Sequence, residues 1–295
     1  MLDPADAAGG GWTIQRVLVW AAEDFRRRGF DSPRLEAELL LAHALGTDRL
    51  RLILDANVTP GSAALSTFRD LIKRRRRAEP VAYIVGVREF FGLPIAVDRR
   101  VLVPRPETEI LVETALERTR NADLYGEALD LCTGSGCVAI AFARRRPTWR
   151  VTGVDISGDA LDVARENARR LGAVWGVDFV ESDLATGLAG EARFDLVIAN
   201  PPYVPTGDLD DLPRDVRDHE PRLALDGGSD GLALVARVVR AAVERLRPGG
   251  VVALEVGAGQ AAAATALLAE HGFEDRAIRR DYAGIERVVS GRRPA

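Results

Sequence analysis

The fold is decided by the stretch from Phe194 to Tyr203, which reads Phe-Asp-Leu-Val-Ile-Ala-Asn-Pro-Pro-Tyr. Its first six residues form a short apolar run of the kind that makes a buried parallel strand. Ligands of open α/β sheets bind beyond the carboxyl ends of the strands. We therefore expect this strand to carry Asn200 to the rim of an active site.

The four residues after the strand suit a nitrogen that bears two hydrogens. Asn200 offers a side-chain oxygen as acceptor, and the carbonyl of Pro201 is a second acceptor on a backbone that two prolines stiffen. Tyr203 is expected to lie flat against a planar amide or ring amino group. The alternative is a plain turn, since Asn-Pro and Pro-Pro are common in turns. We predict Asn200, Pro201 and Tyr203 as catalytic, with Pro202 completing the substrate-binding set.

From residue 127 onward, strand-like and helix-like segments alternate, which is the pattern of a mostly parallel sheet. The class is therefore α/β, with a Rossmann-like domain over residues 106–295. Its expected strands are 128–131, 150–155, 177–181, 194–199, 251–256, 275–279 and 286–290.

The chain before this domain is expected to have three parts. Residues 1–11 form a disordered tail, 12–79 a small helical bundle, and 80–105 a β-hairpin linker built from the apolar runs 81–86 and 90–97. The bundle has no nucleotide loop or catalytic cluster, so we expect a substrate-docking role. Its basic run, Lys73–Arg77, is interpreted as a solvated helix end, with contact to RNA or an acidic partner as the alternative.

Composition excludes several classes of protein. The 295 residues carry a net charge of −4, which argues against a protein whose whole surface binds nucleic acid. No apolar run approaches the ~20 residues of a membrane span, and the start has no signal-peptide pattern. Two cysteines, Cys132 and Cys137, are too few for a metal site or a disulfide framework, so we expect no metal and a reducing cytoplasm.

A glycine-containing loop, Asp130–Gly136, predicts a cofactor site. Its glycines allow a tight turn and the close approach of a ligand. Asp155 ends the next predicted strand and can accept both ribose hydroxyls of a nucleoside. The third glycine of a dehydrogenase loop is absent, since position 139 is alanine.

The acids at the strand ends favour S-adenosylmethionine as the cofactor. Asp130 can face its ammonium and sulfonium groups, and Asp183 can meet the adenine amino group. Each acid could instead be a helix cap or a surface charge. Three acids at successive strand ends favour a site. The full predicted cofactor set is Asp130, Cys132, Thr133, Gly134, Ser135, Gly136, Asp155, Asp183, Leu184 and Asn200.

Together these motifs resemble class I S-adenosylmethionine-dependent methyltransferases that act on planar nitrogen. The closer resemblance is to the HemK/PrmC family, the glutamine-N5 methyltransferases of peptide chain release factors. It runs through nearly the whole chain, including segments 32–45, 88–91, 103–109, 220–225 and 281–284. One departure is Cys132, where the family more often has glycine. If this position needs a positive φ, cysteine costs about 1 kcal/mol or more.

The resemblance implies methyl transfer from S-adenosylmethionine to the glutamine amide in the Gly-Gly-Gln motif of class 1 release factors, with S-adenosylhomocysteine as the other product. It implies a cytoplasmic enzyme, which we expect to be a monomer without a membrane or nucleic-acid partner. None of the three histidines, His43, His219 and His271, adjoins a motif, so the amide proton is expected to leave to water. We also expect the loop 204–230 to close over the substrate.

Four other readings remain open on the residues alone. The substrate could be a glutamine of another protein, such as a ribosomal protein. An adenine-N6 DNA methyltransferase shares the Asn-Pro-Pro-Tyr motif, but would need a recognition domain and a basic cleft. A third reading is a non-catalytic cofactor-binding or ribosome-associated module. The fourth, a nicotinamide dehydrogenase, is disfavoured by the glycine spacing.

Overall fold

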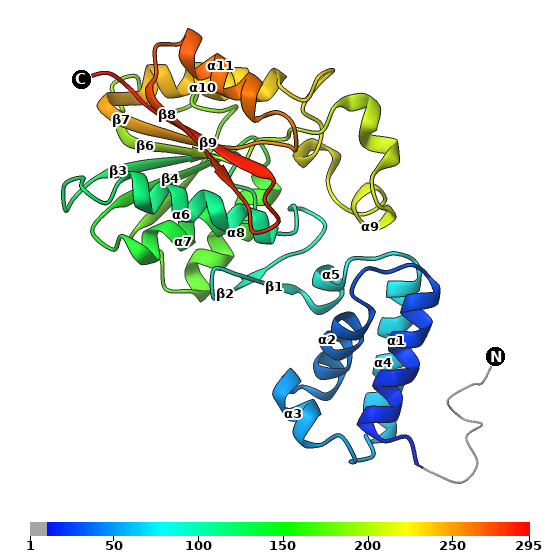
Figure 1. Cartoon of the computed structure of the whole chain (residues 1–295). Coiled ribbons are helices and arrows are strands. Elements are labelled where there is room, and N and C mark those ends of the chain that lie inside the picture. Colours follow the sequence, from blue (N-terminus) through cyan, green and yellow to red (C-terminus); the bar gives the residue numbers. More distant parts are fainter. Residues whose placement is uncertain (1–10) are drawn as a thin grey trace. The chain divides into compact units, whose positions relative to one another are not determined.

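The computed structural model describes residues 11–295, which divide into a helical unit and an α/β unit (Figure 1). The helical unit joins residues 11–86 with Arg214–His219, and the α/β unit joins Val87–Pro213 with Glu220–Ala295. The expected disordered tail, apart from Gly11, lies outside the described residues. Among residues 11–295, no helix is long and apolar enough to span a membrane.

The helical unit is organised around α1 (Ile14–Arg27) and α2 (Pro33–Leu45), with α3 (Arg49–Leu54), α4 (Ser62–Arg76), α5 (Val81–Val85) and the short α9 (Arg214–Arg217). Thr13 caps α1, since its side chain accepts a hydrogen bond from the backbone N–H of Arg16. Gly46 ends α2 in the left-handed conformation. The core of the unit is formed by fully buried side chains such as Phe25, Leu40, Leu41 and Phe68.

The expected strand at residues 81–86 is wrong, because Val81–Val85 is helical. Pro80 precedes this single turn, and Gly86 stops it with a φ of 79°. Ala82 and Ile84 are buried and the turn packs on α2 and α4. Tertiary packing therefore overrides the β-propensity of the run. The hairpin itself is present as β1 (Val87–Phe90) and β2 (Leu93–Ala96), which pair antiparallel.

The interpretation of the basic run as a solvated helix end is also wrong at its centre. The Arg75 side chain is 3% exposed and donates to both carboxylate oxygens of Glu36, at 2.7 and 2.9 Å. Its guanidinium stacks on the Phe30 ring, 3.8 Å from the centroid. The arginines on either side are ion-paired within the same unit. The run is therefore part of the packed structure of the unit, because Glu36 of α2, Asp24 of α1 and Glu79, which follows α4, pair with its arginines.

The α/β unit contains the predicted seven-stranded, mostly parallel sheet, in the order β5-β4-β3-β6-β7-β9-β8. The strands are β3 (Glu127–Leu131), β4 (Arg150–Asp155), β5 (Val177–Glu181), β6 (Phe194–Ala199), β7 (Leu246–Glu255), β8 (Glu274–Arg280) and β9 (Glu286–Arg292). The first five run parallel, whereas β9 pairs antiparallel with both β7 and β8. Strand β7 begins earlier than the predicted 251–256, because it includes Pro248–Gly250, where the pairing with β6 shifts register.

Helices cover both faces of this sheet (Figure 1). One face carries α6 (Glu109–Arg118) and α7 (Cys137–Arg145), with α8 (Gly158–Arg170) beside α7; the other carries α10 (Ala233–Arg245) and α11 (Ala261–Glu270). Between the layers lie buried aliphatic residues such as Leu129, Val197, Val239 and Leu254. A short 3₁₀ helix, η1 (Pro106–Thr108), lies directly before α6, and two more, η2 (Thr206–Asp211) and η3 (Arg222–Ala224), lie in the segment between β6 and α10.

Candidate active site

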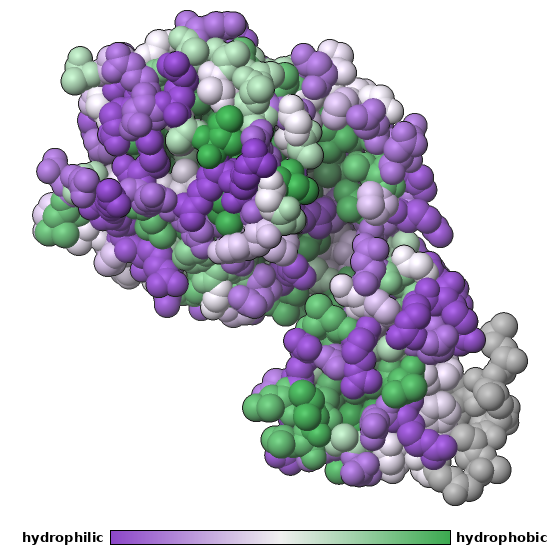
Figure 2. Space-filling model, viewed as in Figure 1, coloured by the Kyte–Doolittle hydropathy of each residue, from purple (hydrophilic) through white to green (hydrophobic). Residues whose placement is uncertain are grey.

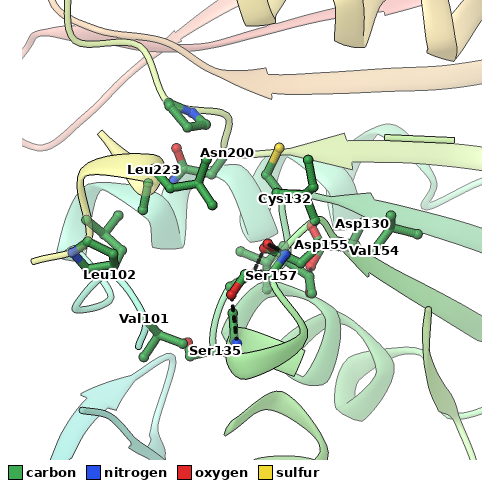
Figure 3. A pocket seen from close by; sticks show the side chains of 18 of the residues that line it. Val101, Leu102, Asp130, Cys132, Ser135, Val154, Asp155, Ser157, Asn200 and Leu223 are labelled. Carbon is green, nitrogen blue, oxygen red and sulfur yellow. Dashed lines mark hydrogen bonds between the residues drawn. The ribbon is translucent and has the colours of Figure 1, made fainter. Parts of the chain in front are cut away.

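A pocket of about 200 Å³ lies beyond the carboxyl ends of β3, β4 and β6, all within the α/β unit (Figure 3). It brings together most of the predicted site. The predicted residues that line it are Asp130, Cys132, Thr133, Gly134, Ser135, Asp155, Asp183, Leu184, Asn200 and Pro202. Gly136, Pro201 and Tyr203 are not among its lining residues.

The loop after β3 turns through three left-handed residues. Cys132, Gly134 and Gly136 have φ values of 60°, 53° and 76°. At Gly136 a side chain would also meet Phe179 and Ala164 at 3.0 and 3.1 Å. The positive φ at Cys132 makes cysteine a strained choice, at a cost of about 1–2 kcal/mol relative to an unstrained backbone.

Asp130 is fully buried beneath this loop. Its carboxylate accepts hydrogen bonds from the Thr133 hydroxyl at 2.6 Å and the Ala139 backbone N–H at 3.2 Å. Burial raises the pKa of Asp130 to about 7, although these two hydrogen bonds act in the opposite direction. A positively charged group placed against Asp130 would favour the ionised carboxylate.

Asp155 closes the same loop from the end of β4. One oxygen accepts from the Gly134 backbone N–H at 2.9 Å, and the other from that of Ser157 at 3.0 Å. Burial raises the pKa of Asp155, and these N–H donors partly offset the effect. The Ser157 hydroxyl caps α8. Figure 3 shows Asp155 and Ser157 facing Leu102 and Leu223 across the pocket.

Asp183 has a partner that the sequence did not reveal. Arg237, on α10, donates to both of its carboxylate oxygens, at 2.8 and 2.7 Å. Both side chains are partly exposed at the pocket wall. An adenine amino group would therefore share Asp183 with Arg237.

The acceptor motif is anchored by residues far away in the sequence. Asn200 donates through Nδ2 to the Thr108 hydroxyl oxygen at 3.2 Å. The Tyr203 hydroxyl donates to Glu255 at 3.3 Å, and the Tyr203 carbonyl accepts from Gln260 Nε2 at 2.9 Å. The Tyr203 hydroxyl therefore links the ring to the end of β7. The stacking of this ring on a substrate amide stays a prediction.

Glu255 is the functional candidate that the sequence reasoning missed. It is 1% exposed, and burial raises its pKa to about 7. Its Oε2 is buried without a hydrogen-bond partner in the described part of the chain. The signal was available, because Glu255 lies near the end of a predicted strand, as do the three acids that were predicted.

An ion pair with a buried carboxylate joins two segments that line the pocket. Arg105 donates to both carboxylate oxygens of Glu220 at 2.8 and 2.9 Å, and the Glu220 side chain is 1% exposed. The pair links the segment before α6, which contributes Leu102 and Pro104 to the pocket, to the segment that contributes Leu223. Removing one partner of such a pair leaves a buried charge uncompensated.

The residues present fit S-adenosylmethionine. Asp130 is a fully buried acid in the pocket, and Asp155, at the end of β4, faces apolar side chains. This arrangement matches a ligand with a cationic end, a ribose and a flat base. Within residues 11–295, no group of three metal-ligating side chains is close enough to hold a metal ion.

Comparison with known proteins gives concordant results over both units. The family described as PrmC N-terminal domain matches residues 16–86, and the methyltransferase small domain matches residues 106–212. A curated release factor glutamine methyltransferase from Geobacter sulfurreducens is 44% identical over 95% of this chain and 97% of its own length. One from Rhodopirellula baltica is 41% identical over 95% and 96%.

Solved structures support the fold of the α/β unit. A methyltransferase from Pyrococcus furiosus has a TM-score of 0.50 at 18% identity and covers 70% of this chain and 91% of its own. The 16S rRNA N2 G1207 methyltransferase of Thermus thermophilus, solved with AdoMet and guanosine, has a TM-score of 0.51 at 20% identity, with 70% and 49% coverage. At these identities the likeness concerns the fold alone.

Proposed function

Because this chain belongs to the release factor glutamine methyltransferase family, we propose that it methylates the side-chain amide nitrogen of the glutamine in the Gly-Gly-Gln motif of class 1 peptide chain release factors, with S-adenosylmethionine as methyl donor. The observation that carries the proposal is the intact Asn-Pro-Pro-Tyr motif, with Asn200 in the wall of the same pocket as Asp130 and Asp155. A methyl acceptor and a cofactor can meet only where both sets of residues face one space.

The cofactor supplies a methyl group on a positively charged sulfur. Asp155 is proposed to accept the ribose hydroxyls, and Asp130 to face the cationic end. Asp183 and Leu184 border the adenine. The loop residues Cys132 to Gly136 let the cofactor approach the backbone closely.

The acceptor amide is a poor nucleophile, so its orientation matters most. The Asn200 Oδ1 and the Pro201 carbonyl are proposed to accept its two N–H bonds and so direct the nitrogen toward the methyl group. Alignment of this kind can contribute several kcal/mol to the rate. The same two oxygens stabilise positive charge that develops on nitrogen. No histidine lines the pocket, so the amide proton is proposed to leave to water.

The helical unit is proposed to dock the release factor. Exposed apolar side chains gather on and next to α3, namely Leu50, Ile53, Leu54 and Val58. Figure 2 shows apolar residues gathered on this face of the helical unit. A contiguous exposed apolar surface of this kind commonly marks a protein-binding site. The loop 204–230 is proposed to close over the bound substrate, which equal protease sensitivity with and without both ligands would contradict.

The test uses S-adenosylmethionine labelled in its methyl group. Purified release factor, the same factor with its Gly-Gly-Gln glutamine replaced, and adenine-containing DNA are offered in parallel to the wild type and to Asn200→Ala. We expect label on the intact release factor alone, and at least about 100-fold less label with Asn200→Ala. Label on DNA would overturn the protein substrate. No label, with the cofactor still bound, would indicate another glutamine-bearing protein or a binding role.

A further inference from the structure

The turn from Asn200 to Tyr203 is a stiff stretch of backbone. Pro201 and Pro202 have a fixed φ, and the backbone of a residue that precedes a proline is restricted as well. The start of the turn is fixed by β6, which lies between β3 and β7 in the sheet. Because a stiff stretch moves as one piece, the direction of the Asn200 side chain and of the Pro201 carbonyl depends on how Tyr203, at its far end, is held.

Tyr203 is held at two points by residues from the connection between β7 and α11. Its hydroxyl donates to Glu255 Oε1 at 3.3 Å, and its carbonyl accepts from Gln260 Nε2 at 2.9 Å. Its ring lies against Gly257, where a Cβ would meet Tyr203 Cδ2 at 3.2 Å and Gln260 Oε1 at 2.8 Å. The connection therefore contacts the hydroxyl, the ring and the backbone of Tyr203.

The side-chain amide of Gln260 has a single productive orientation. Its Oε1 accepts from the Gly257 backbone N–H at 2.8 Å, and its Nε2 donates to the Tyr203 carbonyl. A backbone N–H can only donate and a carbonyl can only accept, so the amide turned over would lose both hydrogen bonds. Gly257 is buried, so water has little access to its N–H. Both ends of the Gln260 amide are thus committed to holding this turn.

Gln260 links the turn to the core of the α/β unit. It directly precedes α11, whose first residue, Ala261, is fully buried. The neighbouring Val204 donates instead to the Leu225 carbonyl and accepts from the Gly227 N–H. These three residues all belong to the long segment between β6 and α10, so their contacts hold the turn against that segment and not against the sheet.

We propose that Gln260 is a positioning residue, which holds the Tyr203 carbonyl and so keeps the acceptor oxygens of Asn200 and Pro201 directed at the substrate amide. The inference rests on the proposed methyl transfer to a glutamine amide. Gln260 is not among the residues that line the pocket, so it acts through Tyr203. A displacement of the turn by about 1 Å can cost about 100-fold in rate.

The decisive variant is Gln260→Met, which keeps a side chain of similar length and removes both hydrogen bonds of the amide. We expect kcat to fall at least about tenfold, with the dissociation constant for S-adenosylmethionine within about threefold of wild type. Thr265→Val is the matched control on the same helix, because the Thr265 hydroxyl donates to the Ala261 carbonyl of α11 itself, at 2.7 Å. It should retain the kcat of wild type.

Gln260→Glu separates positioning from a general structural defect. A carboxylate would place an acceptor oxygen against the Tyr203 carbonyl, whereas a neutral acid can donate to it and still accept from the Gly257 N–H. We expect kcat relative to wild type to rise at least about threefold from about pH 8 to about pH 6. The ratio to wild type at each pH removes the titration of the native groups around the turn. The charged and titratable groups that act on Tyr203 are Glu255 at the end of β7, Arg287 on β9 and Arg105 before η1.

The second measurement is hydrogen exchange of backbone amides, which needs no substrate. Gln260→Met should speed exchange at the Gly257 N–H, which loses its acceptor, and at the Val204 N–H of the displaced turn. Thr265→Val should leave both rates unchanged. This readout also serves if a variant is inactive for another reason.

Three results would overturn the proposal: kcat within about threefold of wild type in Gln260→Met, equal impairment of Gln260→Glu at the two pH values, or unchanged exchange at Gly257 and Val204 in Gln260→Met. The failure of the proposed function is distinguishable, because wild type would then not methylate the release factor at any pH. Hydrogen exchange would still report whether Gln260 holds the turn.

Discussion

The proposed cofactor side of the pocket, around Asp130 and Asp155, is held largely by backbone groups, whereas the proposed acceptor side, around Asn200 and Tyr203, is held by side chains. Asp155 accepts from the backbone N–H groups of Gly134 and Ser157. On the acceptor side, Asn200 and Tyr203 use the side chains of Thr108, Glu255 and Gln260.

This difference determines how each side responds to substitution. Backbone donors remain in place when a side chain changes, so the cofactor side is expected to lose affinity gradually. On the acceptor side, a single substitution removes a side chain that holds Asn200 or Tyr203, and no backbone group takes its place. The acceptor side should therefore lose turnover while cofactor binding persists.

The largest expected effect is that of Gly231→Ala on the acceptor side. A Cβ at this glycine would overlap the Tyr203 carbonyl oxygen and lie 2.5 Å from Gln260 Nε2, and its φ of 73° also disfavours alanine. The turn after β6 must shift, and shifts of about 1 Å can cost about 100-fold in rate. We expect a loss of kcat of this size with cofactor affinity retained, measured by turnover and by equilibrium binding.

The matched control is Gly190→Ala, since a Cβ there meets nothing within 4 Å and the backbone needs no positive φ. It should behave as wild type. Equal kcat in Gly231→Ala and Gly190→Ala would contradict the difference between the two sides of the pocket, because it would show that the turn after β6 tolerates displacement.

The next effect is that of Asp155→Asn on the cofactor side. The amide loses one acceptor oxygen, so it cannot serve both backbone donors and the ribose. We expect the dissociation constant for S-adenosylmethionine to rise about tenfold or more, as hydrogen bonds to charged groups contribute about 1.5–3 kcal/mol. At saturating cofactor, kcat should change little.

Asp162→Asn tests whether this effect is local, because Asp162 lies on the following helix and forms an exposed ion pair with Arg165. Calorimetric titration of both variants with the cofactor gives the answer. A fall in kcat at saturation that exceeds the change in affinity would contradict the division between the two sides.

A pH dependence of cofactor affinity should follow from Asp130. Its pKa of about 7 means that the carboxyl is mostly neutral below pH 7 and ionised above it. Since only the carboxylate attracts the cationic cofactor, affinity should rise about tenfold from pH 6 to pH 8. Asp130→Asn should abolish this rise. Parallel pH profiles for wild type and variant would assign the effect to another group.

The smallest effect is expected at Cys132, whose φ is 60°. At an ordinary position alanine is more stable than glycine, but a left-handed position reverses the order. We expect Cys132→Gly to exceed Cys132→Ala in free energy of unfolding by about 0.5–1 kcal/mol. Denaturant unfolding of the two variants measures the difference, and a more stable alanine variant would mean that the loop relaxes to avoid the strain.

The two sides also differ in how well the sequence predicted them. The contacts of Asp130 and Asp155 span 2 to 21 residues, so the glycine loop and the next strand end contain nearly all of the partners. Asn200 and Thr108 are 92 residues apart, and Tyr203 and Glu255 are 52 apart. Partners at such separations are set by the order of strands, which a single sequence pattern does not contain.

The same limit explains the errors in the helical unit. The α/β class and a seven-stranded, mostly parallel sheet followed from periodicity and were confirmed, whereas the order of the strands was not predicted. The helix at Val81–Val85 and the buried Arg75 depend instead on packing against helices distant in the chain. Local propensity describes what a segment prefers alone, and tertiary contacts decided both cases.

The two thiols described at the glycine loop have a consequence for oxidative chemistry. Burial and the carboxylates of Asp155 and Asp130 raise the pKa of Cys132 well above its usual range, and burial raises that of Cys137 to about 12. Peroxides and alkylating reagents attack the thiolate, whose population here is very small at neutral pH. The sulfur atom beside the cofactor pocket should thus survive oxidant concentrations that inactivate enzymes with a reactive cysteine.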